Sequence, residues 1–366
     1  MKPSRKRYLQ YLNPLELLKT KKVLQSNPTI LTTKTATSES QLSLFVYSTD
    51  HCQAVTSIDA HSVNRTMFSK EHNYWLNLDI INKQTVELIG EKIGLHNLVI
   101  EDILTVHQRP KTDEIDNYLT CVLQMMYYNQ ELQTIESEQV SLVLGKNFLI
   151  SFQDDAARDL FNQIRERLKS AGTKIRNSGP DYLLYAMLDA IVDHYFIVLE
   201  NLGEQIETLE EDITRNIADP YTMNRINNLR KELMYFKRSA VPVREVISNI
   251  IRSENENISD SNVKYFKDIL DHSTQANELL ENYRDMLTNI RDLYLSQVNL
   301  KLNEVMKFLA IVTTLLAPAT VIGGIFGMNF DRIPYLHHQD GFWIATVLMI
   351  VIPILMLMYF RKRGWF

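Results

Sequence analysis

The sequence predicts an α+β membrane protein, made of a cytoplasmic α/β domain, a long helical stalk and two transmembrane helices at the C-terminus. Two runs, 308–330 and 341–360, carry no Asp, Glu, Lys or Arg, and each is long enough to cross a hydrocarbon core about 30 Å thick as a helix. Strand-like runs rich in β-branched and aromatic residues are concentrated in residues 42–153. No proline occurs between Pro242 and Pro318, which is typical of one long helix.

The composition argues against two classes of protein. A formal net charge of −5 over 366 residues is not expected for a nucleic-acid-binding protein. The pair Gly145-Lys146 lacks the upstream glycine and the Ser or Thr of a phosphate-binding loop, and the zinc-hydrolase and nucleophile-elbow motifs are absent, so an enzyme is not predicted. The two cysteines, Cys52 and Cys121, fit a reducing compartment and indicate neither a disulfide nor a zinc framework.

The first segments in order are a tail and a mixed domain. Residues 1–41 are rich in Ser, Thr and Lys and are expected to form a polar N-terminal tail, without the apolar core of a signal peptide. Residues 42–175 are expected to form the α/β domain. Strand-like stretches such as "NYWLNLDI" and "YLTCVLQMMYY" alternate there with the helix-like "TVELIGEKIGL" and "NLVIEDIL".

Residues 176–256 predict a helical hairpin with an acidic tip, whose second helix is expected to run from about Tyr221 to Ser239. Residues 200–219 carry seven Asp or Glu and a single Arg. Two interpretations of the tip stay open: a solvated surface, or a patch that concentrates cations or contacts the basic membrane-proximal end of the chain.

The stalk helix is predicted over residues 257–326 and continues into the first span. Apolar residues recur at steps of three and four, and Ser259 or Ser261 is expected to cap the start. A helix this long cannot be buried by its own chain, so we expect an oligomer in which the stalks bundle around an axis.

The charges that flank the spans predict their orientation. Lys307 precedes the first span, and the basic run Arg361–Arg363 follows the second, within a segment 342–366 that forms the span and a basic tail. The connecting segment 327–341 carries one Arg and two Asp. The positive-inside rule therefore predicts a multi-pass protein of the cytoplasmic (inner) membrane with both termini in the cytoplasm.

One face of the first span is made of small or weakly polar residues, here called the small-residue stripe. Its members are Asn303, Met306, Ala310, Thr313, Ala317, Thr320, Gly324 and Gly327. Such a stripe is typical either of close helix packing in lipid or of a pore lining. Packing alone would leave Asn303, Thr313 and Thr320 in need of partners, which a water-filled axis would supply.

Four stretches resemble segments of the CorA family of magnesium channels, in the family's order: "HNLVIEDILTVHQRPK", "YFKDILDH", "RDLYLSQ" and "LNEVMKFLAIVTTLLAPATVIGGIFGMNF". The resemblance implies a funnel-shaped homopentamer in the lipid bilayer, with the first span of each chain lining the pore. It implies that Gly327, Met328 and Asn329 form the selectivity filter, with Gly327 allowing a sharp turn where the helix ends. Five neutral amides would hold hydrated Mg²⁺ without removing its water.

The resemblance also implies roles for other residues. Asn303, Thr313 and Thr320 are expected to line the pore, Met306 and Leu309 to form a hydrophobic gate, and Ala317 to stand where a relative has a bulkier methionine. Regulatory Mg²⁺ is expected between neighbouring chains at Asp102 and Asp268, with Glu101 and Asp292 as further ligands. The implied function is Mg²⁺ uptake gated by cytosolic Mg²⁺, with Co²⁺ or Ni²⁺ as other cations carried.

The external segment departs from the family. Many relatives have Met-Pro-Glu-Leu after the filter, whereas this chain has "IPYL", so that Tyr335 replaces the Glu and Asp331 and Asp340 supply the negative charge. His337 and His338 offer nitrogen ligands that suit softer cations. A Zn²⁺, Co²⁺ or Ni²⁺ transporter on the same fold is the alternative function, and a scaffold that conducts nothing is a third interpretation.

Overall fold

The computed structural model describes residues 40–69, 71–106, 108–154, 160–215, 221–329, 333–334 and 338–365. The predicted tail 1–41 therefore lies outside the described residues except at its last two positions. The chain divides into two compact units. The first unit is formed by Met1–Asn201 and Met234–Leu280, and the second unit by Leu202–Leu233 and Glu281–Phe366.

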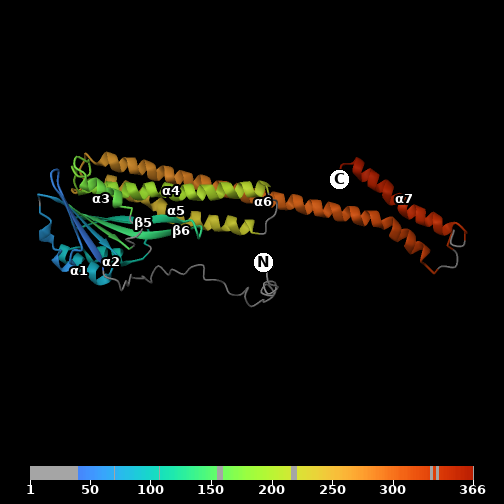
Figure 1. The fold of residues 1–366 in the computed structure, drawn as a ribbon, viewed down its shortest axis with the longest axis horizontal. Helices are drawn as coiled ribbons and strands as arrows, with labels where there is room; N and C mark the ends of the chain where they lie inside the picture. The colour runs from blue at the N-terminus through green and yellow to red at the C-terminus, as the bar shows by residue number, and fades with distance from the viewer. Residues whose placement is uncertain are drawn as a thin grey trace. The chain divides into compact units, whose positions relative to one another are not determined.

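The first unit contains a seven-stranded sheet in the order β2-β1-β3-β7-β6-β5-β4 (Figure 1). The strands are β1 (Gln41–Tyr47), β2 (Cys52–Thr56), β3 (Asn73–Asp79), β4 (Lys111–Ile115), β5 (Tyr118–Asn129), β6 (Thr134–Leu144) and β7 (Phe148–Gln153). Strands β3 and β7 pair in parallel at the centre, with Trp75 opposite Leu149, and the other neighbours are antiparallel.

Helices α1 (Lys83–Ile93) and α2 (Asn97–Leu104) cover one face of the sheet. The side chain of Asn82 accepts a hydrogen bond at the start of α1, and Gly94 ends it with a φ of 81°, a left-handed conformation that favours glycine. At Gly90 the two helices approach so closely that an added Cβ would lie 2.6 Å from Cδ1 of Ile100. These features fix α2, and with it the segment "IEDIL", against the sheet.

The other face is covered by α3 (Asn162–Lys169) and the first part of α4 (Pro180–Arg215). The fully buried Trp75 packs edge-on against Phe161, which directly precedes α3, and donates to Oγ of Ser151 at 2.8 Å. The hydroxyl of Tyr195 on α4 donates to the backbone oxygen of Gln124 at 2.7 Å. A buried aromatic side chain whose polar tip finds a partner is typical of a well-packed core.

Three further helices complete the described chain: α5 (Thr222–Arg252), α6 (Val263–Phe326) and α7 (Gly341–Lys362). Two details of the sequence prediction are wrong. Helix α5 does not end near Ser239 but continues through Pro242, because a proline removes one hydrogen bond and need not break a packed helix. Neither predicted serine is at the cap position, because α6 begins at Val263 and Asn262 directly precedes it; the hydroxyls of Ser259 and Ser261 hydrogen-bond each other at 2.9 Å.

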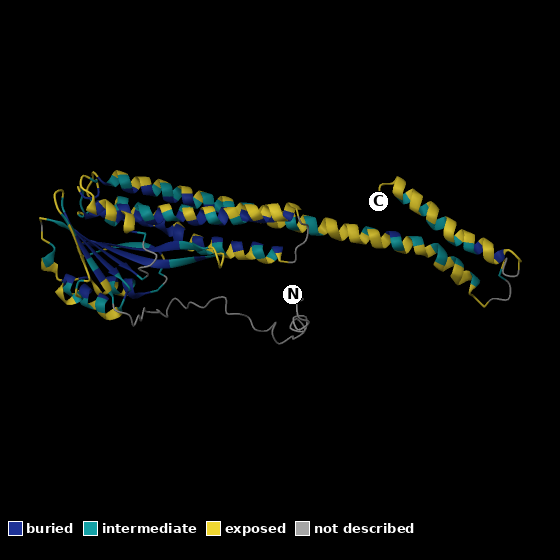
Figure 2. Ribbon diagram, viewed as in Figure 1, coloured by how far each residue is buried: buried dark blue, intermediate teal, exposed yellow. Residues whose placement is uncertain are grey.

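Among the described residues, three helices are long and apolar enough to cross a membrane: α4, α6 and α7. Their most apolar windows differ in burial, with 61% buried in α4 against 6% in α6 and 11% in α7. Figure 2 shows the same contrast as dark blue along α4 and yellow along α7 and the end of α6. Helix α4 is therefore a core helix, whereas α6 and α7 expose their apolar surface, as a lipid-facing helix does.

Candidate ion pathway and cation-binding sites

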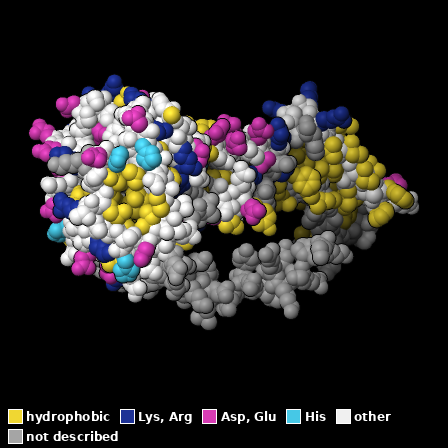
Figure 3. Space-filling view, turned by 60° about the vertical axis from the view of Figure 1, so that its left-hand side comes forward, with side chains coloured by type: hydrophobic (Ala, Val, Ile, Leu, Met, Phe, Trp, Pro, Cys, Tyr) yellow, Lys and Arg dark blue, Asp and Glu magenta, His cyan; other side chains and the backbone are white. Residues whose placement is uncertain are grey.

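In the second unit, α7 runs antiparallel to the C-terminal part of α6 (Figure 1). Nζ of Lys307 lies 3.5 Å from the backbone oxygen of Gly364 at one end of the pair, and an added Cβ on Gly323 would lie 3.7 Å from Cε of Met349 nearer the other. Ile311 is 4% exposed within this contact. Figure 3 shows the remaining apolar surface of the pair in yellow, with Lys and Arg side chains gathered at one end.

The small-residue stripe lies on the face of α6 that α7 leaves uncovered. Every member of the stripe is exposed, as is Leu309. At about 100° per residue, the stripe is centred nearly opposite Ile311, Leu315 and Ile322, which are buried or half-buried. The predicted pore positions thus share a face that is open in a single chain.

The threonine hydroxyls of the stripe have partners in their own helix. Oγ1 of Thr313 donates to the carbonyl oxygens of Leu309 and Ala310, both at 3.0 Å, and Oγ1 of Thr320 donates to that of Leu316 at 3.0 Å. The sequence argument that packing would leave these threonines without partners is therefore wrong, because the backbone of the preceding turn satisfies the donor. The hydroxyl oxygens keep lone pairs that can accept from the uncovered side.

The Gly-Met-Asn motif follows directly on α6. The amide of Gly327 donates to the oxygen of Gly323 at 3.0 Å, and that of Met328 donates to the oxygen of Ile325 at 3.3 Å. Helix α6 ends at Phe326, Gly327 lies in a turn and Met328 in a bend, and Gly327 does not have a positive φ. Met328 and Asn329 are exposed at the helix end.

The carboxylate of Asp102, in the last turn of α2, is held by two donors. Nζ of Lys111 lies 2.6 Å from its Oδ2, and Nε2 of Gln108 donates to its Oδ1 at 2.7 Å. Lys111 also pairs with Asp113 at 3.0 Å. Partial burial of the ammonium opposes the effect, but the hydrogen bonds to Asp102 and Asp113 raise the pKa of Lys111 above its usual value.

Asp102 and Asp268 lie on opposite sides of the sheet in one chain. Asp102 is on α2, whereas Asp268 is exposed on the part of α6 that lies beside α4 (Figure 1). A cation bound by both would therefore need Asp268 from a second chain. Glu101 is exposed in a groove between α1 and α2, and Asp292 is exposed on α6 in the second unit, 3.0 Å from Arg291.

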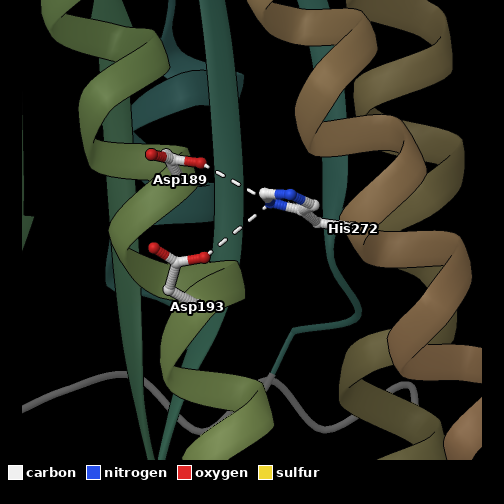
Figure 4. Close-up of side chains that lie close together, drawn as sticks. All are labelled: Asp189, Asp193 and His272. Carbon is white, nitrogen blue, oxygen red and sulfur yellow. Dashed lines mark ion pairs between the residues drawn. The ribbon is translucent and has the colours of Figure 1, made fainter.

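The structure brings together three further residues that the sequence prediction did not include, here called the Asp189 cluster (Figure 4). Asp189 and Asp193 are one turn apart on α4, and their Oδ1 atoms lie 4.0 and 3.8 Å from Nδ1 of His272 on α6. One ligand atom from each residue lies within 4.8 Å of the others. Carboxylate oxygens and an imidazole nitrogen at this spacing suit a divalent cation.

The electrostatics of the Asp189 cluster point the same way. Burial, then the charge of Asp193, raises the pKa of Asp189, and His272 opposes this while Asp268 adds to it. Nδ1 of His272 is buried and has no hydrogen-bond partner among the described residues. Asp268 is therefore close to a second group of carboxylates. The sequence contains two signals for this cluster, a pair of Asp residues four positions apart and the stretch "DILDH" that includes His272. Only the packing of α4 on α6 shows that they lie together.

Two other predicted features lie partly within the described residues. At the acidic tip, Arg215 pairs with Glu211 at 3.0 Å and Arg225 with Asp212 at 2.5 Å, so two of its carboxylates have cationic partners. In the external segment, Nδ1 of His338 accepts from the amide of Asp340 at 3.2 Å. Asp331, Tyr335 and His337 lie outside the described residues.

Comparisons with known proteins agree with one another. The family model described as "CorA-like Mg2+ transporter protein" matches residues 70–362. The cobalt/magnesium transport protein CorA of Thermotoga maritima is 40% identical over 292 residues, which cover 80% of this chain and 83% of that protein. The putative metal ion transporter YfjQ of Bacillus subtilis is 31% identical, with coverage of 80% and 90%.

Solved structures resemble the chain in fold. The complete CorA magnesium transporter of Methanocaldococcus jannaschii matches with a TM-score of 0.74 at 24% identity, covering 90% of this chain and 100% of that one. The cytoplasmic domain of ZntB from Vibrio parahaemolyticus matches with a TM-score of 0.55 at 16% identity, covering 70% and 97%. The likeness thus extends over both units.

Proposed function

The chain belongs to the family of CorA-like Mg²⁺ transporters, and from this we propose that it is a channel that carries Mg²⁺ across the cytoplasmic membrane and is not an enzyme. The observation that carries the proposal is the small-residue stripe, which faces away from α7 and leads to Asn329. Five chains around an axis would turn these stripes toward each other and cover the apolar surface that a single chain exposes.

The polar atoms of the stripe suit a hydrated cation. Mg²⁺ keeps its waters, and those waters present hydrogens outward. Because the hydroxyl hydrogens of Thr313 and Thr320 point to backbone carbonyls, their oxygens are available as acceptors for such waters. The amide oxygens of five Asn329 side chains would act in the same way at the outer end. Neutral acceptors bind the ion weakly enough to release it, as conduction requires.

Gating is proposed to combine an apolar ring with cation-binding carboxylates. Met306 and Leu309 are 62% and 61% exposed on the uncovered face, where a ring of them would exclude water. Mg²⁺ bound between Asp102 of one chain and Asp268 of the next would hold neighbouring chains together, and its loss would favour the open state. We include Glu101 and Asp292 as further ligands of regulatory Mg²⁺.

The orientation of the helix pair supports cytoplasmic termini. Lys307 approaches Gly364, so it lies at the same end of the pair as the basic run Arg361–Arg363. The positive-inside rule places that end in the cytoplasm and the Gly-Met-Asn motif outside.

The test is ion flux into proteoliposomes that hold the purified protein, with Mg²⁺, Co²⁺, Ni²⁺ and Zn²⁺ offered separately. Mg²⁺ entry that is lost in Asn329→Ala and kept in Asn224→Ala, an exposed position on α5, supports the proposal. Entry of the other cations without Mg²⁺ would overturn the substrate and keep the fold. No flux of any cation would favour the scaffold.

A transporter of Zn²⁺, Co²⁺ or Ni²⁺ is the second candidate function. It is favoured by His272 in the Asp189 cluster, because imidazole nitrogen suits these softer cations better than Mg²⁺. The relative in Thermotoga maritima carries cobalt as well as magnesium in its name.

A further inference from the structure

Lys111 is shared between two carboxylates at the first residue of β4. Its Nζ lies 2.6 Å from Oδ2 of Asp102 and 3.0 Å from Oδ2 of Asp113. The side chain of Asp102 is 17% exposed, against 39% for Lys111 and 41% for Asp113. Lys111 is therefore the more exposed partner, and its ammonium occupies Oδ2 of the less accessible carboxylate.

Asp102 has further contacts with two glutamine side chains. Nε2 of Gln108 holds Oδ1, and the buried Gln139 donates from its Nε2 to the backbone oxygen of Asp102 at 3.1 Å. Oε1 of the same Gln139 accepts from the amide of Gln108 at 3.2 Å. The backbone of Asp102 is thus held from β6 and its Oδ1 by Gln108, while Lys111 occupies Oδ2. A cation that binds Oδ2 has to displace Lys111.

Lys111 is suited to such an exchange. Lysine carries a compact charge on a flexible stem, so its ammonium can leave Asp102 while the backbone stays in β4. Two cations on one carboxylate oxygen repel each other strongly at this distance. Asp113 offers Lys111 a second partner, which lowers the cost of leaving Asp102.

We propose that Lys111 is a tethered cation that competes with regulatory Mg²⁺ for Asp102, and that Asp113 sets the strength of this competition by holding Lys111 when Mg²⁺ binds. This inference rests on the regulatory role proposed above for Asp102. It adds that the Mg²⁺ concentration at which the channel closes depends on Lys111, which is not itself a ligand of the ion.

The competition predicts opposite effects from two neutral substitutions. Lys111→Met removes the competitor, so a lower Mg²⁺ concentration should be enough to half-saturate the site. Asp113→Asn leaves Lys111 with Asp102 as its remaining partner, so more Mg²⁺ should be needed. Each shift in the half-saturating concentration is expected to be about two- to fivefold, as for a partly exposed ion pair. Lys111→Arg should preserve the competition in part, because it keeps the charge.

Two matched controls separate this competition from a general change in charge. Glu114→Gln removes a negative charge next to Asp113, on the opposite face of β4, because side chains alternate along a strand. Lys146→Met removes an exposed positive charge between β6 and β7. Neither side chain faces Asp102, so both controls should leave the half-saturating Mg²⁺ concentration nearly unchanged.

The experiment titrates MgCl₂ into the full-length protein in lipid nanodiscs and follows the rise in melting temperature, since a cation that binds the folded state stabilises it. Flux through proteoliposomes at graded internal Mg²⁺ gives a second, independent midpoint. Midpoints that move down in Lys111→Met and up in Asp113→Asn support the proposal. Equal shifts in the controls, an unchanged midpoint in Lys111→Met, or a downward shift in Asp113→Asn would overturn it.

Asp102→Asn separates this inference from the proposed function. If this variant leaves the Mg²⁺ midpoint at the wild-type value, Asp102 is not a regulatory ligand and the role proposed above fails, together with the competition. If Asp102→Asn moves the midpoint while Lys111→Met does not, the regulatory role stands and only the competition is refuted.

Discussion

Replacement of Asp181 by alanine should destabilise the first unit strongly. Asp181 is 4% exposed at the start of α4. Its Oδ1 accepts from the amide of Tyr182 at 2.9 Å, and its Oδ2 accepts from the amide of Ser259 at 2.9 Å and from Nδ2 of Asn262 at 2.8 Å. One carboxylate therefore joins the beginning of α4 to the beginning of α6, 78 to 81 residues later.

The size of the effect follows from these three hydrogen bonds. A hydrogen bond to a charged group contributes roughly 1.5–3 kcal/mol, and donors left buried without a partner add to the loss. The carboxylate's desolvation, which the variant avoids, offsets part of this. We expect a net loss of about 3 kcal/mol, which at roughly 2–4 °C per kcal/mol for a domain of 150–250 residues lowers the melting temperature by about 6–12 °C.

The measurement is thermal unfolding of the full-length protein in nanodiscs, followed by intrinsic fluorescence. Asp260→Ala is the control, because Asp260 is an exposed acid in the segment between α5 and α6 that Asp181 contacts. A fall of less than about 2 °C in Asp181→Ala would refute the reasoning that this carboxylate ties the two helices together. So would an equal fall in Asp260→Ala, because the effect would then be one of charge alone.

Three more predictions concern the cation sites and the helix packing. Burial and the charge of Asp193 raise the pKa of Asp189, so its contribution to stability is present below the unfolded pKa and is lost as pH rises through the folded pKa. In metal-free buffer, the melting temperature should therefore fall less in Asp189→Asn than in the wild type as the pH is raised above the unfolded pKa of about 4. Gly90→Ala should cost about 1–3 kcal/mol in chemical denaturation, because the new methyl would lie 2.6 Å from Cδ1 of Ile100, and a neutral result would show that α1 and α2 can separate freely. Thr320→Val should lower Mg²⁺ flux several-fold without changing the melting temperature, whereas Thr320→Ser, which keeps the acceptor oxygen, should retain most of the flux.

Much of the helical architecture could be predicted from local sequence. The absence of charge over 308–330 and 341–360 is enough to indicate two helices long and apolar enough to span a membrane. Helices α6 and α7 cover most of both runs. Helix α4 also contains a window apolar enough to cross a membrane, but Asp189, Asp193 and Glu200 interrupt its sequence, which agrees with its prediction as part of a helical hairpin. Which of its faces is buried depends on packing against the sheet and could not be read from the sequence.

Contacts between side chains distant in sequence are the part that sequence could not supply. Asp189 and His272 are on different helices, and the distance that unites them depends on how α4 and α6 pack. The Lys111–Asp102 pair depends on the path of the chain from α2 into β4. Local chemistry was also misjudged at Thr313 and Thr320, whose side chains were expected to lack partners but donate to the preceding turn of their own helix.

In the proposed channel, the regulatory sites use charged ligands and the pore uses neutral ones, because the ion has to stay longer at a regulatory site than in the pore. At Asp102 and Asp268 the proposed acceptors are carboxylates, whose full charges would hold a divalent cation long enough to report its concentration. Along the small-residue stripe the acceptors are hydroxyl and amide oxygens, which hold hydration waters and release them quickly. A carboxylate introduced at Thr320 should therefore bind Mg²⁺ more tightly and slow its passage, whereas an amide introduced at Asp102 should weaken sensing and leave passage intact. Flux rate and Mg²⁺ midpoint, measured together in Thr320→Asp and Asp102→Asn, separate the two roles, and a common change in both quantities would contradict this division.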